Sequence, residues 1–370
     1  MIWDLPNLLV CLVVIFAARL LGKIKLSHAI GLTLISFVPF FLNNVLFDPR
    51  YMPDQFLYWR LLSAVRDFSY NSNFYNIRVT EAVYMYAFLP LPFVETISSV
   101  GFFNKFLMIS VFIWASAVLK LRGWILWFLM LYPSLLLYSS LSLREMLICT
   151  LMLFALWTLM RGWYLFTVLF ICLLVQVKMQ NALIVVFFSS IYLVDKFSSL
   201  VLTRKKLLVV LGVFFLLAYL LFPFLVGKVE HYRLRMFLED GGLMADYHPI
   251  SSLVDFLHHG LLGILHTLFA PLPWECNGIF QRIQSVENIA VAALLLGFTW
   301  HSYRKIPKQT LLWLVFLLSG LFMYGLVVNN VGTIVRYKLP FIVVYLILLS
   351  YEQVRANERN VRASSYALNN

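Results

Sequence analysis

Long apolar runs dominate this chain, and they restrict the folds open to it more than any other feature. Each run holds 14 to 21 residues, and a helix needs roughly 20 residues to cross a bilayer. Of the 370 residues 62% are hydrophobic and 12% are charged, whereas a soluble domain carries about 25% charged residues. The runs lie at 5–22, 27–47, 102–119, 124–141, 144–160, 163–177, 181–194, 206–226, 286–302, 310–328 and 338–351.

These runs predict an all-α, polytopic integral membrane protein with about 11 transmembrane helices in a single membrane domain, 1–370. A membrane β-barrel would instead show weak segments of about ten residues with alternating polarity. Pro90, Pro92 and Glu95 break one further apolar stretch, 82–98, and His258, His259 and the following Pro271 break another, 253–270. We expect these two to be re-entrant or interfacial segments.

The basic residues predict the orientation of the chain. With the N-terminus placed outside, the inner loops and the tail 352–370 hold sixteen basic residues and three acidic ones. The rest of the chain holds thirteen basic and fourteen acidic residues. Because positive charge collects on the cytoplasmic side, this split predicts a periplasmic N-terminus and a cytoplasmic C-terminus. The two large loops, about 48–101 and 227–285, then both lie in the periplasm. Topology and anionic lipid explain the basic pI, so it does not indicate nucleic-acid binding.

Several cations lie on the outer side, against this rule, and need another reason. Arginine grips phosphate oxygens with two parallel hydrogen bonds, so a phosphate or pyrophosphate just outside the hydrocarbon is the natural ligand. The residues that we assign to such a pyrophosphate or substrate site are Arg60, Arg144, Lys178, Arg282, Arg336 and Tyr337.

Arg144 and Glu145 stand side by side in YSSLSLREML, residues 138–147, at the outer start of a predicted helix. One interpretation is a capping box, with Ser142 as N-cap and Glu145 three residues later. That interpretation accounts for Glu145 as well as a functional role does. It accounts less well for Arg144, because a cation at a helix N-terminus opposes the helix dipole.

Two other polar breaks have a structural and a functional interpretation. Lys178, within LVQVKMQNALI, either snorkels to the headgroups or marks a site below the membrane surface. Arg336 and Tyr337 open the last span after an Asn-Gly bend. Tyr337 fits an interfacial anchor, whereas Arg336 beside the bend favours a ligand contact.

Asp54, Glu145 and His248 are the candidate catalytic residues, each able to act as a general base on a hydroxyl. The loop around Asp54 is rich in Tyr, Asn and Arg, which suits sugar rings, although a solvated interfacial helix explains any single residue as well. His258 and His259 are adjacent, so their side chains point about 100° apart on a helix. We expect no metal and no cofactor, because phosphate-loop, dinucleotide and HExxH motifs are absent.

Three segments, YPSLLLYSSLSLREML, FAPLPWE (269–275) and NNVGTIVRYKLPF, together with the layout of many spans and two large outer loops, resemble bacterial polysaccharide polymerases of the O-antigen (Wzy) and EpsG-like type. The resemblance covers the general layout over most of the chain. It implies a bacterial inner-membrane glycosyltransferase that joins undecaprenyl-pyrophosphate-linked repeat units into a surface polysaccharide, such as the O-antigen of lipopolysaccharide, at the periplasmic face. Arg144, Lys178 and Arg336 would stabilise the leaving pyrophosphate without a metal, and Asp54, Glu145 or His248 would take the acceptor proton.

The implied partners are the lipid-linked oligosaccharide, membrane lipid and, beside the enzyme, a flippase and a chain-length regulator. Two alternatives remain open. A glycosyltransferase of the GT-C type would take one sugar from a polyprenyl monophosphate and often uses a divalent metal. A flippase or other transporter of lipid-linked oligosaccharide would move its substrate without lengthening it, and no internal repeat of the transporter kind is evident.

Overall fold

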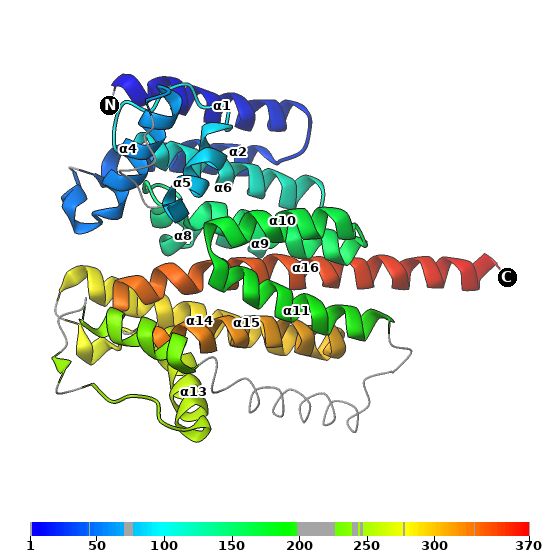
Figure 1. Cartoon of the computed structure of the whole chain (residues 1–370). Helices are drawn as coiled ribbons and strands as arrows, with labels where there is room; N and C mark the ends of the chain where they lie inside the picture. The colour runs from blue at the N-terminus through cyan, green and yellow to red at the C-terminus, as the bar shows by residue number, and fades with distance from the viewer. Residues whose placement is uncertain are drawn as a thin grey trace. The chain divides into compact units, whose positions relative to one another are not determined.

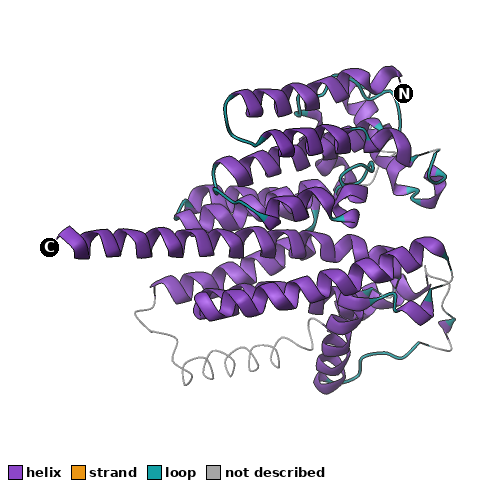
Figure 2. Cartoon of the chain, turned by 180° about the vertical axis from the view of Figure 1, so that it is seen from behind, coloured by secondary structure: helices purple, strands orange, loops and turns teal. Residues whose placement is uncertain are grey.

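Helices joined by turns and loops make up the part of the chain that the computed structural model describes, as Figures 1 and 2 show. The described residues are 2–43, 45–69, 77–197, 226–238, 243–244, 247–276, 278–328 and 330–369. They group into two compact units, Met1–Leu183 with Ile342–Asn370 (unit 1) and Ile184–Phe341 (unit 2). The chain passes from one unit to the other within helices α11 (Met179–Phe197) and α16 (Val331–Asn369).

Six helices among the described residues are long and apolar enough to cross a membrane. They support a helical membrane protein, and the predicted count of about 11 spans is not confirmed. The predicted span at 206–226 lies almost wholly outside the described residues. The six candidate spans are Ile2–Leu20, Ser99–Ala117, Met179–Phe197, Ile279–Lys305, Pro307–Val327 and Gly332–Val361.

Three shorter apolar helices, Leu26–Leu42, Tyr164–Val177 and Leu253–Phe269, accompany the six. The last of these is α13, which runs unbroken past His258 and His259. His258 and His259 therefore do not break this stretch, and the expectation that 253–270 is re-entrant or interfacial stays a prediction. The stretch 82–98 is helical only to Ala87, the end of α5 (Ile77–Ala87).

The predicted span at 124–141 is divided into two short helices, α7 (Trp124–Leu131) and α8 (Pro133–Tyr138). Tyr132 between them is extended, with ψ of 109°, because the residue before a proline is disfavoured in the helical region. A non-helical turn, 139–144, follows α8 and leads into α9 (Glu145–Arg161).

In unit 1, α6 (Ser99–Ala117) packs against α1 (Leu5–Leu20), α9 and α2 (Leu26–Ser36), and α9 packs against α10 (Tyr164–Val177). Figure 1 shows these helices lying nearly parallel in successive layers. Most side chains of α6 and α9 are buried, which places these two helices in the core of the unit.

In unit 1, segments that were predicted to lie on one side of the membrane contact one another at one end of the helices, and segments predicted to lie on the other side do so at the other end. At one end, Asp4 accepts hydrogen bonds from Ser99 Oγ (2.7 Å) and Thr96 Oγ1 (2.6 Å), which joins the starts of α1 and α6. At the other end, Ser116 Oγ donates to the Lys23 carbonyl (3.0 Å). Lys120 and Glu358 form an ion pair of 3.2 Å, which joins α16 to the segment that follows α6.

In unit 2, α13 packs closely on α15 (Pro307–Val327). A Cβ on Gly263 would lie 2.5 Å from the Gly325 carbonyl carbon, and one on Gly325 would lie 2.3 Å from that of Gly263. Small residues allow membrane helices to approach at this distance. Asp195 and Lys308 form an ion pair of 2.9 Å, which fixes the end of α11 to the start of α15.

Candidate functional site

The turn 139–144 of unit 1 is a stretch of irregular backbone that is buried among the helices, and Glu145 follows it as the first residue of α9. Every residue from Ser139 to Glu145 is buried except Arg144, which is half-buried. Buried carbonyl and amide groups outside a helix need partners, because each unpaired group costs free energy. Polar side chains from several helices supply those partners.

Asn104 of α6 and Tyr86 of α5 bind the carbonyl groups of the turn. The Asn104 amide donates to Leu141 O (2.7 Å) and Leu143 O (2.6 Å). The Tyr86 hydroxyl lies 2.9 Å from Leu143 O and 2.6 Å from Asn104 Oδ1. Gly101 makes this approach of α6 possible, because a Cβ there would lie 2.3 Å from the Ser140 carbonyl oxygen.

Two further segments, α4 and the chain around Ile97, bind Ser142 of the turn. Gln55 of α4 (Asp54–Arg66) pairs with Asn43 through two hydrogen bonds of 3.1 Å, and its Oε1 also accepts from Ser142 N (3.2 Å). Ser142 Oγ donates to the Ile97 carbonyl. Ser142 is therefore not an N-cap, and the capping-box interpretation of Glu145 is wrong: α9 begins at Glu145 itself, after Arg144.

Arg144 lies where two helix ends meet. Its Nη1 donates to Val177 O (2.8 Å), one of the last carbonyls of α10. This contact explains a cation that opposes the dipole of α9, because the C-terminus of α10 attracts it. The Arg144 Nε is buried and has no hydrogen-bond partner among the described residues. Lys178 follows Val177 directly and is 9% exposed, so two of the predicted cations lie at these neighbouring helix ends.

Glu145 lies beside the same cluster and is 1% exposed. Burial holds the pKa of the Tyr86 hydroxyl well above its ordinary value; the nearby Glu145 and Tyr58 raise it further, and Arg144 opposes them. The site therefore combines a carboxyl group, a guanidinium and tyrosine hydroxyl groups around one turn. Gln176 and Glu81 form an adjoining contact: with its amide nitrogen turned toward Glu81, Gln176 donates to both carboxylate oxygens at 2.9 and 3.1 Å.

The other predicted residues of unit 1 lie away from this turn. Asp54 and Arg60 are exposed on α4, at its start and middle. Arg66, at the end of α4, donates to the carbonyls of Leu91, Leu89 (3.0 Å) and Ala87 (3.3 Å). Burial lowers the pKa of Arg66. Arg66 therefore holds the chain after α5 in place.

The remaining predicted residues belong to unit 2. Arg282 is exposed near the start of α14 (Ile279–Lys305), and His248 is exposed in the second large loop. Arg336 and Tyr337 are half-buried on α16; the Arg336 guanidinium lies 5.8 Å from the Tyr337 ring centre, and the Tyr337 and Tyr324 rings lie 4.8 Å apart. The convergence of Arg336 with Arg144 stays a prediction.

The second large loop begins with a helix, 226–238, and residues 247–250 of the same loop are bound to that helix. Glu230 accepts hydrogen bonds from Tyr247 Oη (2.6 Å) and Ile250 N (2.8 Å), and Arg233 Nη1 donates to His248 O (2.7 Å). Burial, with help from Glu230, raises the pKa of Tyr247 to about 12. These contacts involve the backbone of His248 and leave its imidazole exposed.

Lys338 occupies a second buried junction, in unit 2. Its Nζ donates to Thr267 O (3.0 Å), Leu268 O (3.1 Å) and Asn288 Oδ1 (2.9 Å). The first two are terminal carbonyls of α13, where a cation is favoured. Lys338 therefore connects α13, α14 and α16, and Asn288 Nδ2 extends the junction to Ala270 O in the FAPLPWE segment.

Sequence reasoning missed Asn104, Tyr86, Gln55 and Lys105. Lys105 is wholly buried on α6 and donates to Ser139 Oγ (2.8 Å). Its position inside a predicted span was a usable signal, because an ionisable residue within a span is by default a functional candidate. No group of three or more His, Cys, Asp or Glu residues that could hold a metal occurs among the described residues.

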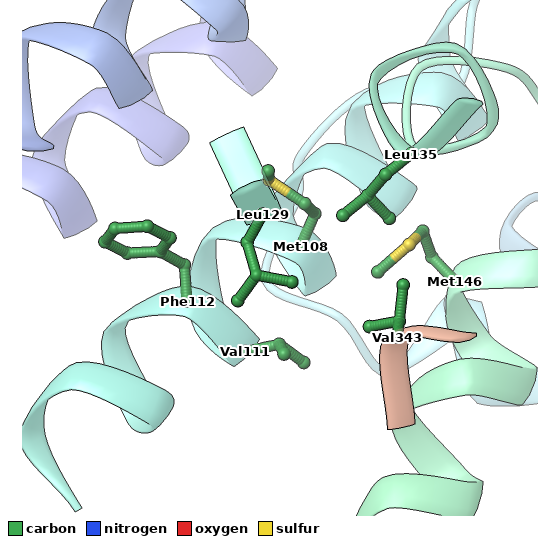
Figure 3. A pocket seen from close by; sticks show the side chains of 7 residues that line it. All are labelled: Met108, Val111, Phe112, Leu129, Leu135, Met146 and Val343. Carbon is green, nitrogen blue, oxygen red and sulfur yellow. The ribbon is translucent and has the colours of Figure 1, made fainter. Parts of the chain in front are cut away.

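An apolar cavity near the turn is too small to be the site. Figure 3 shows Met108, Phe112, Leu129 and Leu135 among the side chains around it. Its volume is about 10 Å³, the lower limit for a single water molecule, and its apolar walls offer no partner to one. It is a packing gap of the core of unit 1.

No protein-family model, no curated protein and no solved structure matches this chain.

Proposed function

We propose that this protein is a membrane glycosyltransferase of the polysaccharide-polymerase type, acting on undecaprenyl-pyrophosphate-linked repeat units at the periplasmic face of a bacterial inner membrane. The observation that carries the proposal is the hydrogen bond from Arg144, at the start of α9, to Val177 O at the end of α10. Lys178 is the next residue after Val177, so two cations of the predicted set belong to these neighbouring helix ends. The guanidinium is half-buried and uses one of its nitrogens on the protein, among the described residues.

The reaction would form a bond between an acceptor hydroxyl oxygen and the anomeric carbon of the growing glycan. The bond from that carbon to the pyrophosphate would break, and the pyrophosphate would leave with the electron pair. Arg144 and Lys178 would stabilise its negative charge, which is the largest electrostatic demand of such a transfer. A base would accept the hydroxyl proton, and of the three candidates Glu145 lies beside Arg144.

The arrangement within unit 1 supports a one-sided reaction. The start of α9 and the segments around Ile97 and Asp4 meet at one end of the unit, away from Lys23 and Lys120. A flippase needs polar groups along a path to both sides, and the linked polar groups around the turn cluster at one end. The flippase and chain-length partners, the lipid substrate and the metal independence belong to the same proposal.

The test is Arg144→Ala in a strain whose own copy is deleted, with the surface polysaccharide ladder as the readout. We expect long glycan to fall by about 100-fold or more, the loss typical when one charge-stabilising donor is removed. Expression should change little, because the folded protein loses one hydrogen bond of about 1 kcal/mol. Arg144→Lys keeps the charge and should retain part of the activity.

Arg122→Ala is the matched control, since Arg122 is an exposed arginine outside the turn. Purified protein with lipid-linked repeat units, assayed with and without EDTA, separates the alternatives. Inhibition by EDTA, with a single added sugar, would favour the polyprenyl-monophosphate enzyme. A normal ladder in well-expressed Arg144→Ala would remove Arg144 from the site.

A further inference from the structure

A second, larger cavity opens in unit 1 beside the turn. Its volume is about 440 Å³, within the range of about 300–1,000 Å³ that is usual for ligand pockets. The start of α4, with the short helix before it, forms one wall, and a non-helical strap, 94–97, forms the other. The lining residues are Asp48, Pro49, Arg50, Phe56, Trp59, Glu95, Thr96 and Ile97.

The walls of this cavity are fixed by hydrogen bonds. Trp59 Nε1 donates to Val94 O (3.0 Å), which holds the indole ring against the strap. Thr96 Oγ1 donates to Asp4 (2.6 Å). The Ile97 carbonyl accepts from Ser142 of the turn. The cavity is therefore preformed, and one of its walls is bonded directly to the chain two residues before Arg144.

The lining chemistry is that of a carbohydrate site. Phe56 and Trp59 offer partly exposed aromatic faces on which the CH groups of a sugar ring can stack. Asp48 and Glu95 are exposed carboxylates, which accept hydrogen bonds from hydroxyl groups. A mainly apolar cavity with a few fixed polar groups is the usual form of a small-molecule site.

Other ligands fit this lining less well. A phosphate would face two carboxylates and one arginine, and Arg50 already lies 3.7 Å from Asp48. A lipid chain would bury these charges without partners. A metal ion would find two carboxylates in the lining, and the described residues contain no group of three metal-binding side chains.

We propose that this cavity binds a sugar of the acceptor glycan, with Trp59 as the stacking platform and Asp48 and Glu95 as acceptors for its hydroxyl groups. This inference rests on the proposed function. It places the acceptor sugar beside the turn whose cations would hold the leaving pyrophosphate, within the same unit.

The test is binding of the purified full-length protein, in lipid nanodiscs, to a printed array of bacterial surface oligosaccharides. The wild type should bind a subset of glycans. Trp59→Ala should weaken that binding about tenfold, the scale of one lost stacking contact. Glu95→Gln keeps the shape of the side chain and should weaken binding or change which glycans bind.

Trp124→Ala is the matched control, because Trp124 is an exposed tryptophan outside the cavity lining. Trp59→Phe keeps an aromatic face and should keep most of the binding. If Trp59→Ala fails to fold, Glu95→Gln carries the test. Equal binding by the wild type, Trp59→Ala and Glu95→Gln would overturn the inference, as would a wild type that binds no glycan.

The array and the ladder separate the two proposals. Glycan binding that depends on Trp59, together with a normal ladder in Arg144→Ala, would leave the sugar site standing and would count against the proposed role of Arg144. If the ladder depends on Arg144 but glycan binding does not depend on Trp59, the proposed role of Arg144 is supported and the sugar site is contradicted.

Discussion

Each unit contains one buried junction that is built around a cation, and the two junctions differ in how many of the cation's donors have acceptors. At the junction of unit 2, Lys338 has three acceptors for its three ammonium hydrogens. At the turn of unit 1, the Arg144 Nε is buried without a partner among the described residues, and Lys105 has one acceptor, Ser139 Oγ.

This difference separates structural cations from candidate functional ones. A buried cation whose donors are all used on the protein has nothing left for a ligand. A buried or half-buried cation with spare donors pays a desolvation cost that is recovered only when an anion or another acceptor arrives. On this criterion Lys338 is structural, and Arg144 stays a candidate for the proposed site.

The largest effect is expected at Lys338. Lys338→Met would leave Thr267 O, Leu268 O and Asn288 Oδ1 without this donor, and Glu287 without a nearby positive charge. Each buried group left unpaired costs about 1–3 kcal/mol, so we expect a loss of about 3 kcal/mol or more. Thermal unfolding in detergent and the expression level measure it. If Lys338→Met is as stable as the wild type, Lys338 is not a structural cation and the comparison of the two junctions fails.

A somewhat smaller loss is expected at Asn104. Asn104→Leu keeps the approximate size of the side chain and removes the donor to Leu141 O and Leu143 O. Since Tyr86 still reaches Leu143 O, we expect about 2 kcal/mol of destabilisation from one unpaired carbonyl and the lost network. The same unfolding assay measures it. Asn181→Leu, at another buried asparagine of unit 1, is the control, and an equal loss there would show that the turn has no special dependence on Asn104.

The sequence predicts the helical membrane architecture because the length and polarity of each run are local properties. It also locates Arg144 and Lys178, which interrupt those runs at helix ends. It cannot predict that Ser142 binds Ile97 and Gln55 instead of capping α9, because those partners lie 45 and 87 residues away along the chain. Asn104 and Tyr86 are single polar residues in apolar surroundings, and only the packing of α5 and α6 on the turn gives them a role.

The smallest change in stability is expected at Lys105. This position gives the most direct test of the comparison between the two junctions, because Lys105 and Lys338 are both almost fully buried. Lys105→Met preserves the length of the side chain and removes one hydrogen bond, to Ser139 Oγ, which keeps a second contact with Leu136 O (3.2 Å). The substitution loses this hydrogen bond, but it also removes the cost of desolvating an ammonium group inside a candidate span. Because the two effects oppose each other, we expect the free energy of unfolding to change by no more than about 1 kcal/mol in either direction. Measured beside Lys338→Met in the same detergent, the two variants should differ by at least about 2 kcal/mol. If they destabilise equally, the number of acceptors around a buried lysine does not decide its contribution here, and the distinction between a completed junction and an open one fails.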